Sequence, residues 1–148
     1  KGSELDSNIQ LAKDLNINDR VIFTGLRLDV EKIHASFNIF TLLSEKNAEM
    51  FPNVIIESLS YFNPFIGANT TGVPEAAKDG QGFICEPNDI KCISEKLEKL
   101  IKSKELRDKM GKIGRKSVDE KLSSPSLSVI VFSMVFIIEL VSCVKPFT

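Results

Sequence analysis

Apolar residues follow two patterns along this chain, helical spacing and short continuous runs. Helical spacing predicts helices over residues 3–15, 29–36 and 53–61, a single turn over 72–75, and two amphipathic helices capped by Asn88 and Ser103. The apolar runs predict strands over residues 20–24, 37–43, 64–68 and 82–85. The run 37–43 is typical of a strand that is covered on both faces.

Strands and helices alternate in this prediction, so we expect the α/β fold class. Short strands linked by helices favour a Rossmann-like parallel sheet with helices on both faces. The pattern covers residues 1–122, which we interpret as one domain of ordinary size. Because no strand precedes the helix at 3–15, this domain is expected to lack its first strand.

Residues 123–148 form an atypical apolar tail. From Leu127 to Val144 nearly every residue is apolar, and Glu139 interrupts the run. Three interpretations stay open: an element packed on the domain, a membrane anchor, or sequence foreign to the domain. An anchor would bury Glu139 in the bilayer at a cost of about 2.5–3.5 kcal/mol.

Charge and cysteine content narrow the classes of function. The net charge is −1, so no overall field attracts nucleic acid, and no nucleic-acid partner is expected. Cys85, Cys92 and Cys143 show no metal-ligand spacing, and we expect free buried thiols in a reducing, cytoplasmic compartment. His34 is the single histidine, and a structural role is expected for it.

The glutamates Glu49 and Glu57 carry the clearest chemical signal. Glu49 lies in the loop after the apolar run 37–43, and Glu57 lies in the predicted helix 53–61. The two carboxylates would therefore flank a helix N-terminus. Such a site can hold a phosphate on backbone amides and hydroxyl groups on the carboxylates. Sugar nucleotides are ligands of this kind.

Several sequence blocks, taken in order, resemble one protein family. They are residues 19–25, Ser44 with 49–57, 64–66, 71–75 and 79–87. In this order they resemble the C-terminal, donor-binding half of the retaining GT-B glycosyltransferases of group 1 (family 4). The resemblance runs from Gly2 to Leu122. It implies transfer of a sugar from a nucleotide diphosphate to an acceptor hydroxyl, with retention of the anomeric configuration.

The resemblance also implies roles for individual residues. Glu49 matches the catalytic glutamate that contacts the donor sugar near the reacting carbon, and Glu57 matches the glutamate that holds the ribose. The residues expected at the sugar and diphosphate are Phe51, Pro52, Asn53 and Val54. The residues expected near the base are Gly25, Leu26 and Arg27.

The resemblance further implies which ligands and partners to expect. The nucleotide sugar is a substrate, and no metal or other cofactor is expected, because the chain contains no Asp-x-Asp motif. A carbohydrate or lipid-linked acceptor would bind an N-terminal domain that these residues do not include. The fragment alone is therefore expected to be inactive. Peripheral association with the inner face of a membrane stays open.

Two departures from the family pattern keep other functions open. Met50 stands where the family usually has glycine, and Phe62 replaces a glycine that commonly ends the helix. Met50 favours a non-catalytic module that binds a nucleotide sugar. An epimerase that acts on nucleotide sugars would use the same architecture, although the paired glutamates fit the transferases better.

Overall fold

The structure, a computed structural model, describes residues 4–44 and 53–122 of the chain. The chain divides into two compact units, Lys1–Ile33 and His34–Thr148. The predicted tail, residues 123–148, and the predicted N-cap Ser3 lie outside the described residues. Within the described residues, no helix is long and apolar enough to cross a membrane.

The first unit contains the helix α1 (Leu5–Asp14), which confirms the prediction of a helix over 3–15. Asn16 follows α1 with a left-handed φ of 54°. The backbone N–H groups of Asn16 and Ile17 donate to carbonyl groups in the last turn of α1, at Lys13 and Ala12. This pattern ends a helix and suits asparagine at the left-handed position.

The strand predicted over residues 20–24 does not form, and that prediction was wrong. A strand needs a neighbour for its N–H and C=O groups. The strands within the described part of the chain pair only with one another. Without a pairing partner, the apolar run has no regular secondary structure, and Ile22 is 87% exposed.

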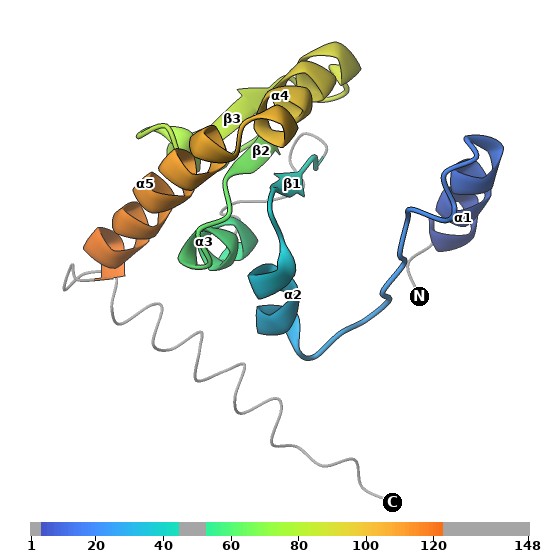
Figure 1. Ribbon diagram of the computed structural model, residues 1–148, viewed down its shortest axis with the longest axis horizontal. Helices are drawn as coiled ribbons and strands as arrows, with labels where there is room; N and C mark the ends of the chain where they lie inside the picture. Colours follow the sequence, from blue (N-terminus) through green and yellow to red (C-terminus); the bar gives the residue numbers. More distant parts are fainter. Residues whose placement is uncertain (1–3, 45–52, 123–148) are drawn as a thin grey trace, which may run out of the picture. The chain divides into compact units, whose positions relative to one another are not determined.

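The second unit contains a parallel sheet of β1 (Phe40–Leu42), β2 (Phe65–Ala68) and β3 (Gly82–Cys85), in the order β1-β2-β3. Around the strands lie α3 (Asn53–Ser60), the 3-10 turn η1 (Pro74–Ala77), α4 (Ile90–Lys102) and α5 (Lys104–Leu122) (Figure 1). The helix α2 (Val30–Ser36) begins in the first unit and ends in the second. This arrangement confirms the prediction of a Rossmann-like α/β fold.

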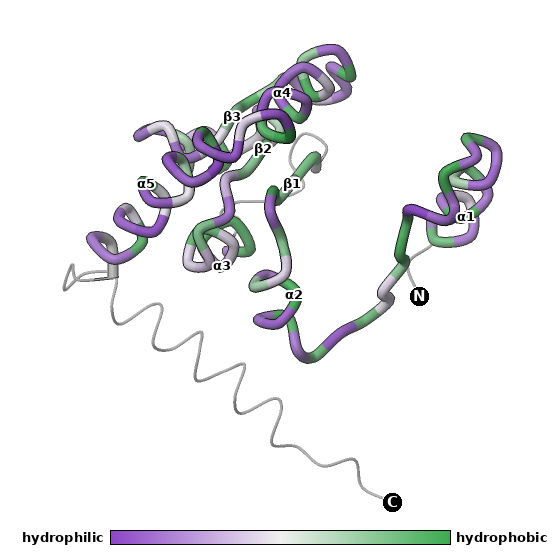
Figure 2. The backbone as a smooth tube through the Cα atoms, in the orientation of Figure 1, coloured by the Kyte–Doolittle hydropathy of each residue, from purple (hydrophilic) through white to green (hydrophobic). Residues whose placement is uncertain are grey.

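Helices cover both faces of β2, which is the central and fully buried strand. Phe65 packs in a cluster with Ile55 and Leu59 of α3, whereas Ile66 packs with Leu100 of α4 and Met110 of α5. Neighbouring residues of a strand point to opposite faces, so the two clusters lie on opposite sides of the sheet. Figure 2 shows that α3 is more hydrophobic than α5.

The edge strand β1 is less covered than the sequence predicted. Its three residues alternate between half-buried and exposed, and Thr41 is exposed. The apolar run 37–43 therefore forms a short edge strand, not a strand that is covered on both faces. Among the described strands, β1 has a neighbour on one side only, which is β2.

Side chains cap the N-terminal ends of the last two helices, α4 and α5. Asp89, not the predicted Asn88, caps α4, and its Oδ1 accepts a hydrogen bond from the backbone N–H of Cys92 at 2.9 Å. Asn88 instead takes a left-handed φ of 64°. The prediction that Ser103 caps the following helix is confirmed, because Ser103 Oγ accepts from the N–H of Leu106.

Cys85 and Cys92 form a disulfide, so the prediction of free thiols was wrong for both. Cys85 ends β3 and Cys92 lies in the first turn of α4, which brings their Cα atoms to 5.9 Å. Local sequence patterns could not predict this pairing, because it depends on how the chain returns across the end of β3. Cys143 lies outside the described residues.

The helix α5 holds the end of α3 in place. Arg115 Nη1 donates to the carbonyl O of Ser60 at 2.9 Å. Gly111 allows the close approach of the two helices, because a Cβ atom at this position would collide with the carbonyl O of Phe62. The position of α3 is therefore fixed both by its buried face and by contacts at its C-terminal end.

Candidate functional site

The carboxyl ends of the parallel strands form the candidate site. In open α/β sheets, ligands bind in the crevice beyond these ends. A hydrogen bond of 2.7 Å from Asn69 Nδ2 to Glu86 Oε1 connects the segments after β2 and β3. Next to Asn69, Thr70 is 6% exposed, and its buried Oγ1 has no hydrogen-bond partner among the described residues.

The helix α3 begins at the same edge of the sheet, after β1 and the segment 43–52. Ile55 is fully buried and Leu59 is 3% exposed, so one face of the helix is anchored in the core. Asn53 at its first position is exposed, and Val54 is half-buried. The first N–H groups of a helix lack partners within the helix and attract negative charge.

Glu57 lies on α3, one turn after Asn53. Its side chain is 47% exposed, and its Oε2 lies 3.5 Å from Nε2 of His34, which is 3% exposed. The carboxylate is thus open to solvent on one side and close to a buried imidazole on the other. This proximity could not be predicted from local sequence patterns, because 23 positions separate His34 from Glu57.

Part of the predicted site lies outside the described residues. This is the case for Glu49, Phe51 and Pro52, and for Met50 between them. Their roles at the sugar and the diphosphate stay predictions. The structure does show Asn53, Val54 and Glu57 on one helix, as predicted.

The residues predicted to lie near the base, Gly25, Leu26 and Arg27, belong to the first unit. Gly25 has a left-handed φ of 63°, and Leu26 is 95% exposed. Arg27 Nη2 lies 2.6 Å from Asp29 Oδ2, and Arg27 Nε donates to Oδ1. The hydrogen bond from Arg27 lowers the pKa of Asp29. A contact of these residues with a base stays a prediction.

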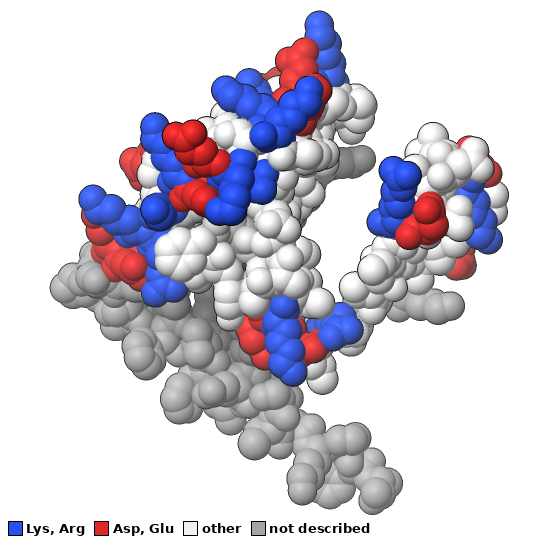
Figure 3. Space-filling model, in the orientation of Figure 1, with Lys and Arg blue, Asp and Glu red and all other residues white. Residues whose placement is uncertain are grey.

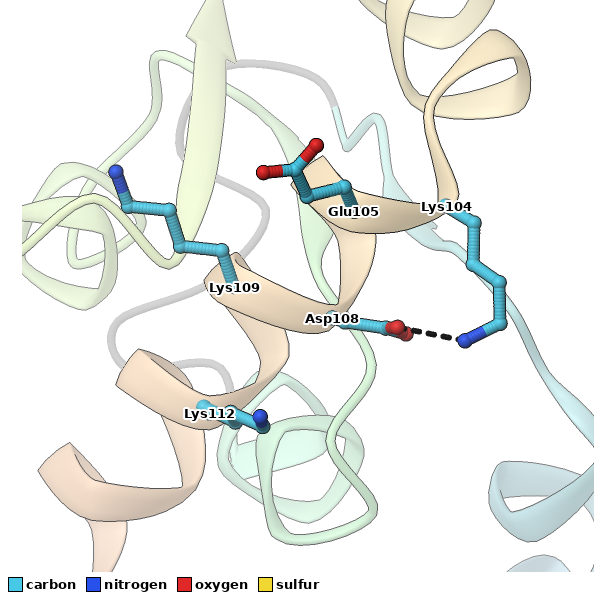
Figure 4. A pocket seen from close by; sticks show the side chains of 5 residues that line it. All are labelled: Lys104, Glu105, Asp108, Lys109 and Lys112. Carbon is cyan, nitrogen blue, oxygen red and sulfur yellow. Dashed lines mark hydrogen bonds and ion pairs between the residues drawn. The ribbon is translucent and has the colours of Figure 1, made fainter.

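A hollow of about 610 Å³ lies along α5, but its chemistry does not suit a ligand site. One helix supplies all of its lining, Lys104, Glu105, Asp108, Lys109 and Lys112. Lys104 and Asp108 pair at 2.6 Å, and the other side chains point in different directions (Figure 4). The hydrogen bond from Lys104 lowers the pKa of Asp108.

The charges around this hollow are of both signs. Figure 3 shows Lys and Arg side chains mixed with Asp and Glu along α4 and α5. Several of them form pairs one helical turn apart, such as Arg115 with Asp119. Such pairs add little stability, and along α4 and α5 they mix charges of both signs. Among the described residues, no three His, Cys, Asp or Glu side chains gather in a way that could hold a metal ion.

Comparison with known proteins identifies the family to which this chain belongs. The model of the family "Glycosyl transferases group 1" matches residues 1–117. The chain belongs to the group 1 glycosyl transferases. Two relatives of this family are the N-acetyl-alpha-D-glucosaminyl L-malate synthase of Bacillus anthracis, at 35% identity over 127 residues, and the capsular polysaccharide biosynthesis glycosyltransferase CapM of Staphylococcus aureus, at 37% identity over 111 residues.

Solved structures support the fold of the group 1 domain. HepE of Anabaena, solved in complex with UDP, superimposes with a TM-score of 0.77 at 18% identity, over 88% of this chain and 36% of HepE. Sucrose-phosphate synthase of Thermosynechococcus elongatus superimposes with a TM-score of 0.75 at 20% identity, over 97% of this chain and 36% of that one.

The group 1 region is only part of the length of its relatives. The match covers 85% of this chain but 33% of the Bacillus anthracis enzyme, and 74% of this chain but 29% of CapM. The chain therefore spans about a third of the length of these relatives.

Proposed function

We propose that this chain is the donor-binding part of a glycosyltransferase. The complete enzyme would transfer a sugar from a nucleotide diphosphate to an acceptor hydroxyl, with retention of the anomeric configuration. The observation that carries this proposal is the position of Glu57. It is exposed on a helix of the group 1 domain that begins at the carboxyl edge of the parallel sheet.

The proposed roles follow from the chemistry of each group. The carboxylate of Glu57 accepts hydrogen bonds from the ribose hydroxyl groups, and bonds to a charged acceptor are the stronger kind. The N–H groups at the start of α3 face the diphosphate and stabilise the charge that grows there as the glycosidic bond breaks. Glu49 positions the donor sugar. This scheme requires no metal, since amide groups and protein cations neutralise the leaving group.

The names of the relatives are consistent with this proposal. HepE was solved with UDP, and CapM is a glycosyltransferase of capsular polysaccharide synthesis. The acceptor would bind a second domain, so this chain alone does not turn over, because catalysis needs donor and acceptor held together. The acceptor of the complete enzyme would be either a carbohydrate or lipid-linked.

Calorimetric titration of the chain with UDP and GDP tests the donor role. We expect weak but saturable binding of one nucleotide. Glu57→Ala should weaken this binding about ten-fold, as expected for loss of hydrogen bonds to a charged acceptor. The matched control is Glu95→Ala, which removes an exposed carboxylate from α4 and should leave binding unchanged.

Two outcomes would count against the proposal in different ways. Equal affinities of the wild-type chain and Glu57→Ala would refute the ribose role of Glu57. Nucleotide binding without any sugar transfer by the complete protein would instead favour a non-catalytic binding module.

A further inference from the structure

His34 occupies an environment that calls for an explanation. It lies near the C-terminal end of α2 and is 3% exposed. Its ring centroid lies 5.6 Å from that of Phe37, 5.7 Å from that of Phe40 and 6.1 Å from that of Tyr61. An apolar ring would fill this aromatic cage without the cost of burying two polar nitrogen atoms. A buried imidazole in such a place therefore suggests a polar task.

The polar group that faces His34 is the carboxylate of Glu57. His34 Nε2 lies 3.5 Å from Glu57 Oε2, which is longer than a hydrogen bond. Neither ring nitrogen of His34 has a hydrogen-bond partner among the described residues. A movement of the Glu57 side chain by a few tenths of an ångström would thus bring Oε2 within hydrogen-bond distance of an unsatisfied, buried N–H group.

The backbone around His34 is held in place, so the imidazole is a fixed point. Asn63 Nδ2 donates to the carbonyl O of His34 at 2.7 Å, and Asn63 is itself 3% exposed. Asn63 follows the C-terminal end of α3, whose second turn carries Glu57. This hydrogen bond therefore connects the end of α2 to the helix that carries the carboxylate.

The carboxylate of Glu57 has capacity for two partners at once. Its two oxygen atoms offer about four acceptor positions. One oxygen, Oε2, is turned toward His34, while the side chain as a whole remains 47% exposed. The oxygen on the solvent side can then accept hydrogen bonds from a ligand. A donor behind the carboxylate would fix its rotamer before the ligand arrives.

We propose that His34 is a positioning residue for Glu57. It donates a hydrogen bond from Nε2 to Oε2, which holds the other carboxylate oxygen toward the vicinal hydroxyl groups of a nucleotide ribose. This inference rests on the proposed function, because it assigns the ribose to Glu57. A nearby carboxylate favours the tautomer that carries the proton on Nε2, and no competing acceptor among the described residues contacts Nδ1.

Paired variants of the full chain test the role of His34. The probes are UDP and 2′,3′-dideoxy-UDP, which lacks the ribose hydroxyl groups. The wild-type chain should prefer UDP by about ten-fold, as expected for hydrogen bonds to a charged acceptor. His34→Phe fills the aromatic cage without an N–H donor and should lose most of that preference. His34→Gln restores an N–H donor and should regain it.

The ring nitrogen atoms of His34 provide a second readout that needs no variant. Because His34 is the only histidine, selective ¹⁵N labelling gives one pair of imidazole signals. UDP should shift the Nε2 signal, and dideoxy-UDP should shift it much less. This measurement remains informative if His34→Phe fails to fold.

The outcomes separate this inference from the function on which it rests. If the wild-type chain does not distinguish the two nucleotides, or Glu57→Ala keeps the preference, the ribose role itself is refuted and the role of His34 with it. If Glu57→Ala abolishes the preference but His34→Phe keeps it, and the Nε2 signal does not move, only the positioning role is refuted. Equal weakening of both nucleotides in His34→Phe would also refute it, since that is the effect of a purely structural residue.

Discussion

At the scale of single residues, one unusual backbone conformation ends the helix that carries Glu57. Phe62 has a φ of 60°, and its N–H donates to the carbonyl O of Leu59, while the N–H of Asn63 donates to Ser58. This is the Schellman pattern, in which glycine is the usual left-handed residue. The first helix ends in the same way with Asn16, which tolerates the conformation better than phenylalanine does.

Replacing Phe62 should therefore change stability in a way that depends on the backbone. We predict that Phe62→Gly is more stable than Phe62→Ala by about 1 kcal/mol, because both variants lose the ring and only glycine relieves the left-handed strain. Chemical denaturation of the two variants measures this difference. Equal unfolding free energies would show that the strain at this position is negligible.

Only part of the site could be predicted residue by residue from the sequence. Asn53, Val54 and Glu57 were predicted on one helix from the apolar spacing of residues 53–61, and α3 confirms that placement. The proximity of His34 could not be predicted, because it depends on how α2 packs against α3. The Cys85–Cys92 disulfide was missed for the same kind of reason.

At the scale of elements, the start of α3 is the part of the site that acts through its backbone. A proline at the first helical position keeps the helix but removes one N–H group. Asn53 occupies that position, so Asn53→Pro tests whether this amide binds the diphosphate. The matched control is Asn53→Ala, which removes the same side chain and keeps the amide.

We predict that Asn53→Pro weakens UDP binding about five-fold more than Asn53→Ala, which corresponds to the loss of one hydrogen bond. Binding of uridine, which has no diphosphate, should be the same in both variants. Titrations of each variant with the two ligands measure these differences. An identical UDP affinity in the two variants would exclude the Asn53 amide from the diphosphate site.

An apolar run in the sequence is sufficient to predict a strand in one case here and not in another. The run 82–85 forms a strand with the predicted bounds, because it pairs in parallel with β2 along its whole length. The run 20–24 has a similar apolar pattern but pairs with no described strand, and it forms no regular secondary structure. A strand depends on a distant partner as well as on its own residues, so pattern alone could not distinguish these two cases.

At the scale of the whole molecule, the proposed function places the nucleotide on one particular surface. The candidate surface is the carboxyl edge of the sheet, with the start of α3 and Glu57. A different surface, the hollow along α5, is lined by lysine and acidic side chains that already include a close pair. The two surfaces involve different elements, so a residue-by-residue binding map can distinguish them.

Amide chemical-shift mapping of the ¹⁵N-labelled chain during titration with UDP is the most direct test. We predict saturable shifts concentrated at residues 53–57 and in the segment Asn69–Thr71 after β2, with residues 104–112 of α5 unaffected. Shifts confined to α5, or no shifts at millimolar UDP, would contradict the assignment of this edge of the sheet as a donor site.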